Sequence, residues 1–349
     1  MEMNNTGAVN PALAGAQRVK GISGSTLKLI AIFTMLIDHT AATILEKILM
    51  ANGLSALYQA DAQAMMQFYA DNGVLYGIYT VMRLIGRIAF PIFCFLLVEG
   101  FLHTRNATKY AVRLALFAAI SEIPFDLALF NKAWDFNHQN VFFTLLIGLL
   151  TLICFRLLKE KADGSENKSW LTALAVLGAL AVGGYVALSM HSILTAITYQ
   201  FSARGMETSF STTGIAIVIA IVGAIIALII YAVMGKKRSL QVANLRFADL
   251  LLLMIGMTVA DLLKTDYSAF GVLTVAVVYG LRKSYFRSML GACITLTIMT
   301  MSEFTCFVNL IFIRFYNGTR GLNLKYIFYV FYPAHLFILY LICRAMNLT

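Results

Sequence analysis

The chain has 349 residues, of which 60% are hydrophobic and only 13% are charged. Soluble globular proteins carry about 25% charged residues, so this composition excludes a soluble enzyme. The formal net charge of +10 is compatible with nucleic-acid binding, but the basic residues form short clusters between apolar segments, as in the loops of membrane proteins. We therefore expect an integral membrane protein that contacts lipids and no nucleic acid.

The first 22 residues differ from the rest of the chain. Residues 1–22 are small and polar, and we expect them to form a disordered cytoplasmic tail without a cleavable signal. Residues 23–349 predict a single all-α transmembrane domain, because a helix satisfies its own backbone hydrogen bonds in lipid. We expect about ten membrane helices, at residues 26–47, 80–102, 110–130, 139–158, 169–190, 212–234, 245–262, 267–281, 288–313 and 325–344.

Lys and Arg residues predict the orientation, because they collect on the cytoplasmic side of a membrane. Most of them lie before the first expected helix, between the second and third, after the fourth, sixth and eighth, and at Arg344 after the tenth. Both termini are then cytoplasmic, in a multi-pass protein of a bacterial inner or plasma membrane. The outer segments 51–79 and 191–211 are long enough for interfacial amphipathic helices, which would form either a simple lid or an acceptor-binding surface.

The cysteines do not indicate a metal site. All five lie in apolar segments and none has the spacing of metal ligands. A small apolar side chain is the ordinary role of such cysteines, so we expect no metal.

Several ionisable residues lie inside the expected helices. A charge at the centre of a membrane helix costs about 2.5–3.5 kcal/mol, so each is retained for a partner or a function. Asp38 and His39 fall past the middle of the first helix, where their side chains point about 100° apart. Each therefore needs a partner from another helix. Arg83 and Arg87 lie one turn apart on one face of the second helix.

Two carboxylates, Glu122 and Asp126, share a face of the third helix. They could simply neutralise Arg83 and Arg87 across a helix interface, or they could belong to a polar site. Prolines lie close to several of the ionisable groups, and the carbonyls that they free need protein or water partners. We therefore expect a cavity that opens to the outer half of the membrane, lined by the first, second, third and tenth helices.

These residue types are sufficient for acyl transfer from a thioester. The reaction needs a base for the attacking group and donors for the developing oxyanion. His39 suits the base, because the ordinary pKa of histidine, about 6.5, lies near working pH. Proton-coupled transporters use the same residue types, however. The candidate site residues are Asp38, His39, Arg83, Arg87, Glu122, Asp126, Asn140 and His335.

Longer motifs favour the acyltransferase. They are K-L-I-A-I-F-T-M-L-I-D-H-T at 28–40, R-L-I-G-R-I-A-F-P-I-F-C-F-L-L-V-E-G-F at 83–101, S-E-I-P-F-D at 121–126, N-V-F-F-T at 140–144, D-Y-S-A-F-G-V-L at 266–273, Y-N-G-T-R-G at 316–321 and F-Y-P-A-H at 331–335. With these motifs in this order, the chain resembles the TraX family, named for the protein that N-acetylates F pilin. That family looks related to a wider group of transmembrane acyltransferases.

The resemblance implies transfer of an acetyl group from cytoplasmic acetyl-CoA to an extracytoplasmic saccharide, surface polymer or peptide amine. His39 matches in place a first-helix histidine that is the presumed catalytic residue of O-acetylating relatives. A proton-coupled transporter or flippase, and a non-catalytic surface-assembly factor, are the alternatives. The basic residues expected to bind the CoA phosphates at the inner surface are Arg105, Lys109, Arg113, Arg282 and Lys283.

Overall fold

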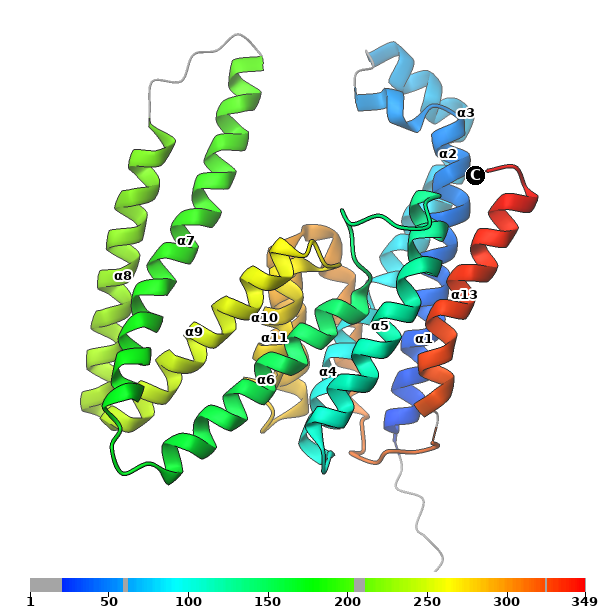
Figure 1. Cartoon of the computed structure of the whole chain (residues 1–349). Coiled ribbons are helices and arrows are strands. Elements are labelled where there is room, and N and C mark those ends of the chain that lie inside the picture. The colour runs from blue at the N-terminus through cyan, green and yellow to red at the C-terminus, as the bar shows by residue number, and fades with distance from the viewer. Residues whose placement is uncertain (1–20, 59–61, 204–210, 324, 349) are drawn as a thin grey trace, which may run out of the picture.

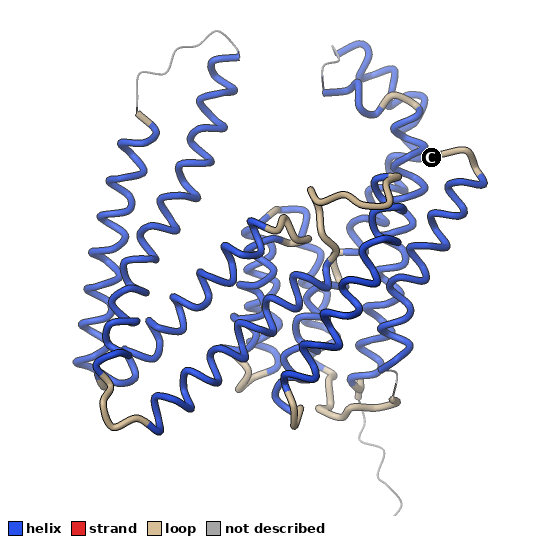
Figure 2. The backbone as a smooth tube through the Cα atoms, viewed as in Figure 1, coloured by secondary structure: helices blue, strands red, loops and turns tan. Residues whose placement is uncertain are grey.

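The computed structural model describes residues 21–58, 62–203, 211–323 and 325–348. Within these ranges every regular element is a helix, as Figure 2 shows, which confirms the all-α prediction. The elements are α1 (Gly24–Thr40), the π-helical turn η2 (Ala41–Leu45), α2 (Glu46–Ala51), η3 (Leu54–Tyr58), α3 (Ala62–Gly86), α4 (Ala89–His103), α5 (Ala107–Phe130), α6 (Val141–Gly164), α7 (Ser169–Ala203), α8 (Thr212–Lys237), α9 (Leu240–Leu262), α10 (Ser268–Gly280), α11 (Tyr285–Met299), η4 (Met301–Val308), α12 (Asn309–Arg314) and α13 (Lys325–Ala345).

The helices have the length and composition of membrane spans. In the described ranges seven segments qualify, and α10 and α11 are shorter apolar helices. The main hydrophobic core lies among α1, α4, α5, α6, α9, α10, α11 and α13. The fold is that of a multi-pass membrane protein. The seven segments are Gly24–Ala51, Ala62–His103, Val141–Gly164, Ser169–Tyr199, Thr212–Lys237, Leu240–Leu262 and Ile327–Ala345.

The second expected span, 80–102, is wrong at its start. The structure has α3 and α4 there, with a break at residues 87–88, and most of the expected outer segment 51–79 is the first part of α3. The break frees backbone carbonyls, which the segment around η4 satisfies. Thr305 Oγ1 donates to Leu84 O (2.7 Å), and Asn309 Nδ2 donates to Ile88 O (2.9 Å). Partners of this kind make a helix break tolerable inside a membrane.

Helices α7 and α8 form a hairpin that extends away from most of the other helices and packs mainly against α9 (Figure 1). The α7 helix continues to Ala203, so the expected interfacial helix at 191–211 is wrong up to that residue; residues 204–210 lie outside the described part of the chain. Gly183 and Gly223 allow close approach of the two backbones. The α8 helix exposes many isoleucines and valines, as expected of a surface covered by lipid.

The expected ninth span, 288–313, is not a single crossing. Helix α11 leads into η4 and α12, which return along it: Cys293 Sγ donates to Cys306 O (3.2 Å), and the rings of Tyr285 and Tyr316 lie 5.0 Å apart. The chain therefore re-enters α13 at the end where α11 began. We call this end, where α1, α5 and α13 begin, the basic end of the bundle.

As a result α13 runs parallel to α1 (Figure 1). Leu322 N donates to Ser25 Oγ at the start of both helices, and His39 meets His335 further along. Residues 21 and 348 lie at opposite ends of the described bundle (Figure 1), whereas the sequence predicts both termini on the cytoplasmic side. Of the expected tail, residues 1–20 lie outside the described range, whereas Ile22 N donates to Phe315 O (2.7 Å).

This topology can be tested with single cysteines in a cysteine-free background. Cysteines at Asn72 and Asn347 should react with an impermeant reagent from one side of the membrane, and a cysteine at Ser165 only from the other. If the basic end is cytoplasmic, the first two react on intact cells. Labelling of Asn347→Cys together with Ser165→Cys would contradict the parallel arrangement of α1 and α13.

Candidate active site

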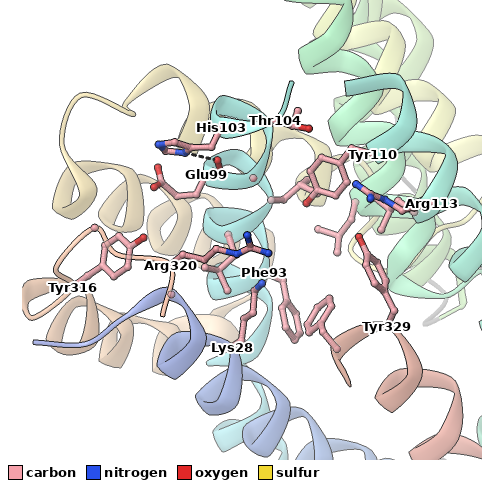
Figure 3. A pocket seen from close by; sticks show the side chains of 18 residues that line it. Lys28, Phe93, Glu99, His103, Thr104, Tyr110, Arg113, Tyr316, Arg320 and Tyr329 are labelled. Carbon is pink, nitrogen blue, oxygen red and sulfur yellow. Dashed lines mark hydrogen bonds between the residues drawn. The ribbon is translucent and has the colours of Figure 1, made fainter. Parts of the chain in front are cut away.

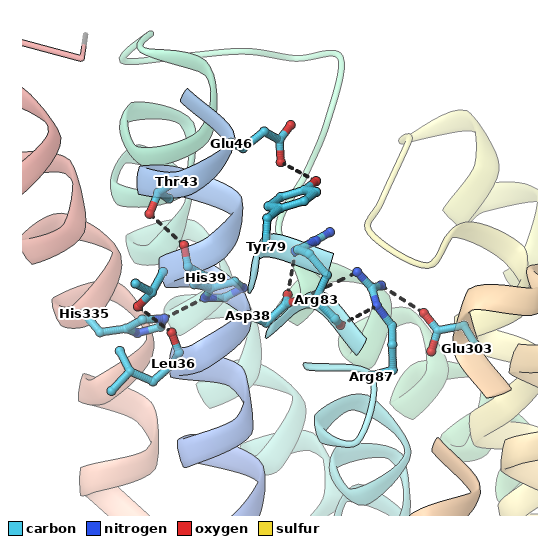
Figure 4. A network of polar contacts seen from close by, with 11 residues as sticks. Leu36, Asp38, His39, Thr43, Glu46, Tyr79, Arg83, Arg87, Glu303 and His335 are labelled. Carbon is cyan, nitrogen blue, oxygen red and sulfur yellow. Dashed lines mark hydrogen bonds and ion pairs between the residues drawn. The ribbon is translucent and has the colours of Figure 1, made fainter. Parts of the chain in front are cut away.

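A cluster of four charged side chains joins α1, α3 and η4 (Figure 4). The Arg83 guanidinium lies 2.8 Å from the Asp38 carboxylate, and Arg87 lies 3.7 Å from Asp38 and 2.9 Å from Glu303. Glu303 is fully buried. A Cβ at Gly86 would overlap the Asp38 carboxylate, so glycine is needed for this approach of α3 to α1. Two cations and two anions balance, as burial of charges requires.

This pairing replaces the expected one. Arg83 and Arg87 do not pair with Glu122 or Asp126 in the structure; their ion-pair partners are Asp38 and Glu303. The sequence places Glu303 inside an apolar segment but does not indicate its partner. The partner lies 216 residues away, so helical periodicity carries no information about it.

Next to this cluster, His39 meets His335 of α13. The His39 Nδ1 and His335 Nε2 atoms lie 2.6 Å apart, and the ring planes differ by 3°. The other nitrogen of His335, Nδ1, lies 2.7 Å from Phe331 O. Tyr332 contacts both rings edge-on. Asp38 and His39 thus find partners on different helices, as the angle between their side chains predicts.

The remaining expected site residues form a separate group where α5 is joined to α6. Asn140 caps α6, and its side chain donates to Ala118 O and to the Glu122 carboxylate. The Asp126 carboxylate accepts from Asp135 N (2.7 Å). Within the described residues, none of these hydrogen bonds reaches Asp38 or His39. In the structure, the hydrogen bonds of Glu122, Asp126 and Asn140 therefore stabilise the connection between α5 and α6.

The D-Y-S-A-F-G motif forms a strained turn beside the charge cluster. Tyr267 and Ser268 have φ of 62° and 46°, a left-handed conformation that ordinary side chains rarely adopt. Tyr267 stacks on Phe90 of α4 with 3.7 Å between ring centroids, and Thr144 Oγ1 donates to Asp266 O. The turn thereby holds the start of α4, one turn after Arg87.

A cavity of about 460 Å³ opens at the basic end of the bundle (Figure 3). The helices that line it include the expected ones, α1, α4, α5 and α13, and α6 and the 316–320 loop also contribute. Its position differs from the prediction, because the predicted cavity opens to the outer half of the membrane. The walls carry three cations, Lys28, Arg113 and Arg320, and one carboxylate, Glu99; its other polar side chains are His103, Thr104, Tyr110, Tyr316 and Tyr329.

The three cations of the cavity have no salt-bridge partner within the described residues. The buried Nε of Arg113 also lacks a hydrogen-bond partner there. Of the five basic residues expected to bind a cofactor, only Arg113 lines the cavity; Arg105, Lys109, Arg282 and Lys283 do not. Lys28 and Arg320 were missed, although each belongs to a motif, at 28–40 and 316–321.

A layer of aromatic side chains separates the cavity from the histidine pair. Phe93, Leu145 and Phe328 line the cavity and also a small space of about 10 Å³, whose other walls include Phe142 and Tyr332. That volume holds no more than about one water molecule. Since Tyr332 contacts both histidines, the layer spans the distance between cavity and histidines.

Comparison with known proteins agrees with these motifs. The family model described as TraX protein matches residues 23–248 and 215–343. A probable fimbrial assembly protein, FimC of serogroup H1 from Dichelobacter nodosus, is 32% identical over 138 residues, which are 38% of this chain and 46% of that protein. The chain thus spans less than half the length of this relative. No solved structure matches. Because the family model covers nearly all of the described helices, this multi-pass membrane protein belongs to the TraX family.

Proposed function

We propose that the protein is a membrane acetyltransferase that uses acetyl-CoA from the basic end of the bundle and an acceptor from the opposite end. One observation carries the proposal. A cavity with three cations that have no salt-bridge partner among the described residues, and the pair of His39 and buried His335, lie in line along the same two parallel helices, α1 and α13.

The cavity has the charge that CoA requires. CoA is a polyanion, and phosphate groups bind most strongly to arginine and lysine side chains that have no carboxylate partner. Lys28, Arg113 and Arg320 meet this description. We assign them to the phosphates of CoA. The basic end then faces the cytoplasm, in a bacterial inner or plasma membrane.

The distance from the cations to the histidines suits the pantetheine arm. Lys28 and His39 lie on one helix, eleven residues and so about 16 Å apart along the axis. The arm is a chain of about twelve bonds, equivalent to about four extended residues or about 14 Å. A CoA molecule with its phosphates at Lys28 would bring its thioester to the aromatic layer, and displacement of Phe328 or Tyr332 would admit it to His39.

The chemistry at that point is acyl transfer. His39 takes the proton from the acceptor hydroxyl or amine as its oxygen or nitrogen attacks the thioester carbonyl. The new C–O or C–N bond forms, the C–S bond breaks, and the proton passes from His39 to the departing thiolate. The relative named as a fimbrial assembly protein suggests a surface polymer or a peptide amine as acceptor.

Binding of CoA to purified protein tests the cavity. Arg320→Gln should raise the Kd for CoA at least about tenfold, because a charge-assisted contact to phosphate is lost. Lys283→Gln, at the same end but outside the cavity, should bind CoA like the wild type. Pantetheine without phosphates should bind weakly to all three proteins. Equal affinity of the wild type for CoA and for pantetheine would contradict the assignment of a phosphate site to this cavity.

Transfer itself is tested with labelled acetyl-CoA added to vesicles in which the basic end of the protein faces outward. An acetyltransferase releases CoA in proportion to acetylated acceptor, or hydrolyses acetyl-CoA slowly without one. A transporter or flippase would move its substrate without consuming acetyl-CoA. A non-catalytic assembly factor, which the name of the relative also suggests, would do neither, and that result would overturn the proposal.

A further inference from the structure

The histidine pair can form its hydrogen bonds in only one way when both rings are neutral. A neutral imidazole has one N–H donor and one bare nitrogen that accepts. A backbone carbonyl only accepts. Since His335 Nδ1 lies 2.7 Å from Phe331 O, that nitrogen carries the proton, and His335 Nε2 is the bare acceptor.

The assignment continues to His39. Its Nδ1 lies 2.6 Å from the bare His335 Nε2, so Nδ1 of His39 carries the proton and donates. The remaining nitrogen, Nε2 of His39, is then bare. Within the described residues the His39 ring makes no other hydrogen bond.

The surroundings hold both rings in this arrangement. Phe331 stacks on His335 with 4.6 Å between centroids, and Tyr332 contacts both histidines. The turn that follows His39 is π-helical over Ala41–Leu45, and Thr43 Oγ1 donates to His39 O (2.6 Å). Wide turns of this kind are rare and frequently occur at functional sites.

We propose that His335 is a positioning residue that holds His39 in the tautomer with a bare Nε2. In terms of the proposed function, on which this role rests, Nε2 of His39 is the atom that takes the acceptor proton. When it does so, the imidazolium of His39 still donates from Nδ1 to His335, which stabilises the new charge. The backbone carbonyl of Phe331 thus fixes the tautomer of His335, and His335 in turn fixes the tautomer of His39 and leaves its reacting Nε2 bare.

Variants at His335 separate this role from simple packing. In His335→Gln the side-chain amide oxygen can accept from His39 Nδ1, whereas His335→Leu fills similar space without an acceptor. We expect His335→Leu to lower kcat at least about tenfold, the size seen when a partner that orients a histidine is lost. The KM for acetyl-CoA should stay unchanged, and His335→Gln should remain within about threefold of the wild type.

The tautomer is measured directly by ¹⁵N NMR of the histidine-labelled protein, with His39→Asn to assign the signals among the five histidines. The wild type should show a protonated Nδ1 and a bare Nε2 at His39, and His335→Leu should lose this preference. A protonated Nε2 at His39 in the wild type, or full activity of His335→Leu, would overturn the inference. Absence of acetyl transfer with the expected tautomer present would instead refute the proposed function alone.

Discussion

His39→Asn should abolish acetyl transfer, with a loss of at least about 10²-fold, the lower range of what a positioned general base contributes. An asparagine amide can donate to His335 Nε2 as His39 Nδ1 does, so the hydrogen bond survives while the base is lost. Insertion, thermal stability and CoA binding should therefore match the wild type. The measurement is the initial rate of CoA release with acceptor, alongside CoA affinity.

His39→Ala provides the matched comparison. It should lose activity to the same extent, but it also leaves His335 Nε2 buried without its partner, at a cost of about 1–3 kcal/mol in unfolding free energy. If both variants lose activity but only His39→Ala loses stability, the lost activity is due to the missing base and not to altered packing. Near-normal turnover of His39→Asn would show that the ring is not the base.

Among the substitutions described, Glu303→Gln should lower the free energy of unfolding the most. Its carboxylate is fully buried and lies 2.9 Å from Arg87, so the substitution removes the nearer of the two carboxylates that Arg87 contacts and leaves the buried cluster with one excess positive charge. Breaking a buried ion pair on one side costs about 3–5 kcal/mol. Thr305 of η4 and Asn309 of α12 also satisfy the carbonyls at the α3–α4 break, so disturbing Glu303 should weaken these contacts as well. Chemical unfolding of the purified protein in detergent measures the free energy of unfolding.

Two controls accompany this variant. Arg87→Met combined with Glu303→Leu removes both charges and should recover most of the loss, since a hydrophobic replacement of a buried pair is often neutral. Arg246→Gln removes the exposed partner of a long ion pair, in which Arg246 lies 3.9 Å from the half-buried Asp249, and should change the unfolding free energy by less than about 1 kcal/mol. Equal effects of Glu303→Gln and Arg246→Gln would show that the cluster does not stabilise the fold.

The sequence by itself determined the class of protein and the residues that need explanation. The low share of charged residues and the repeated apolar segments require a membrane and helices. The cost of burying charge singles out Asp38, His39, Arg83 and Arg87, and the angle between successive side chains on a helix predicts that Asp38 and His39 have different partners. The motifs also contained Lys28 and Arg320, but nothing local distinguished these two from the other basic residues of the inner clusters.

Only the tertiary structure decided which groups meet. The partners of Asp38, His39 and Arg87 come from distant helices, and helical periodicity predicts a face but not the neighbour on that face. Apolar composition is also the same whether a segment crosses the membrane or turns back within it. The sequence therefore predicts one span at 288–313, whereas α11, η4 and α12 form a hairpin there. That hairpin makes α13 parallel to α1, and this direction brings His335 beside His39 and Arg320 beside Lys28.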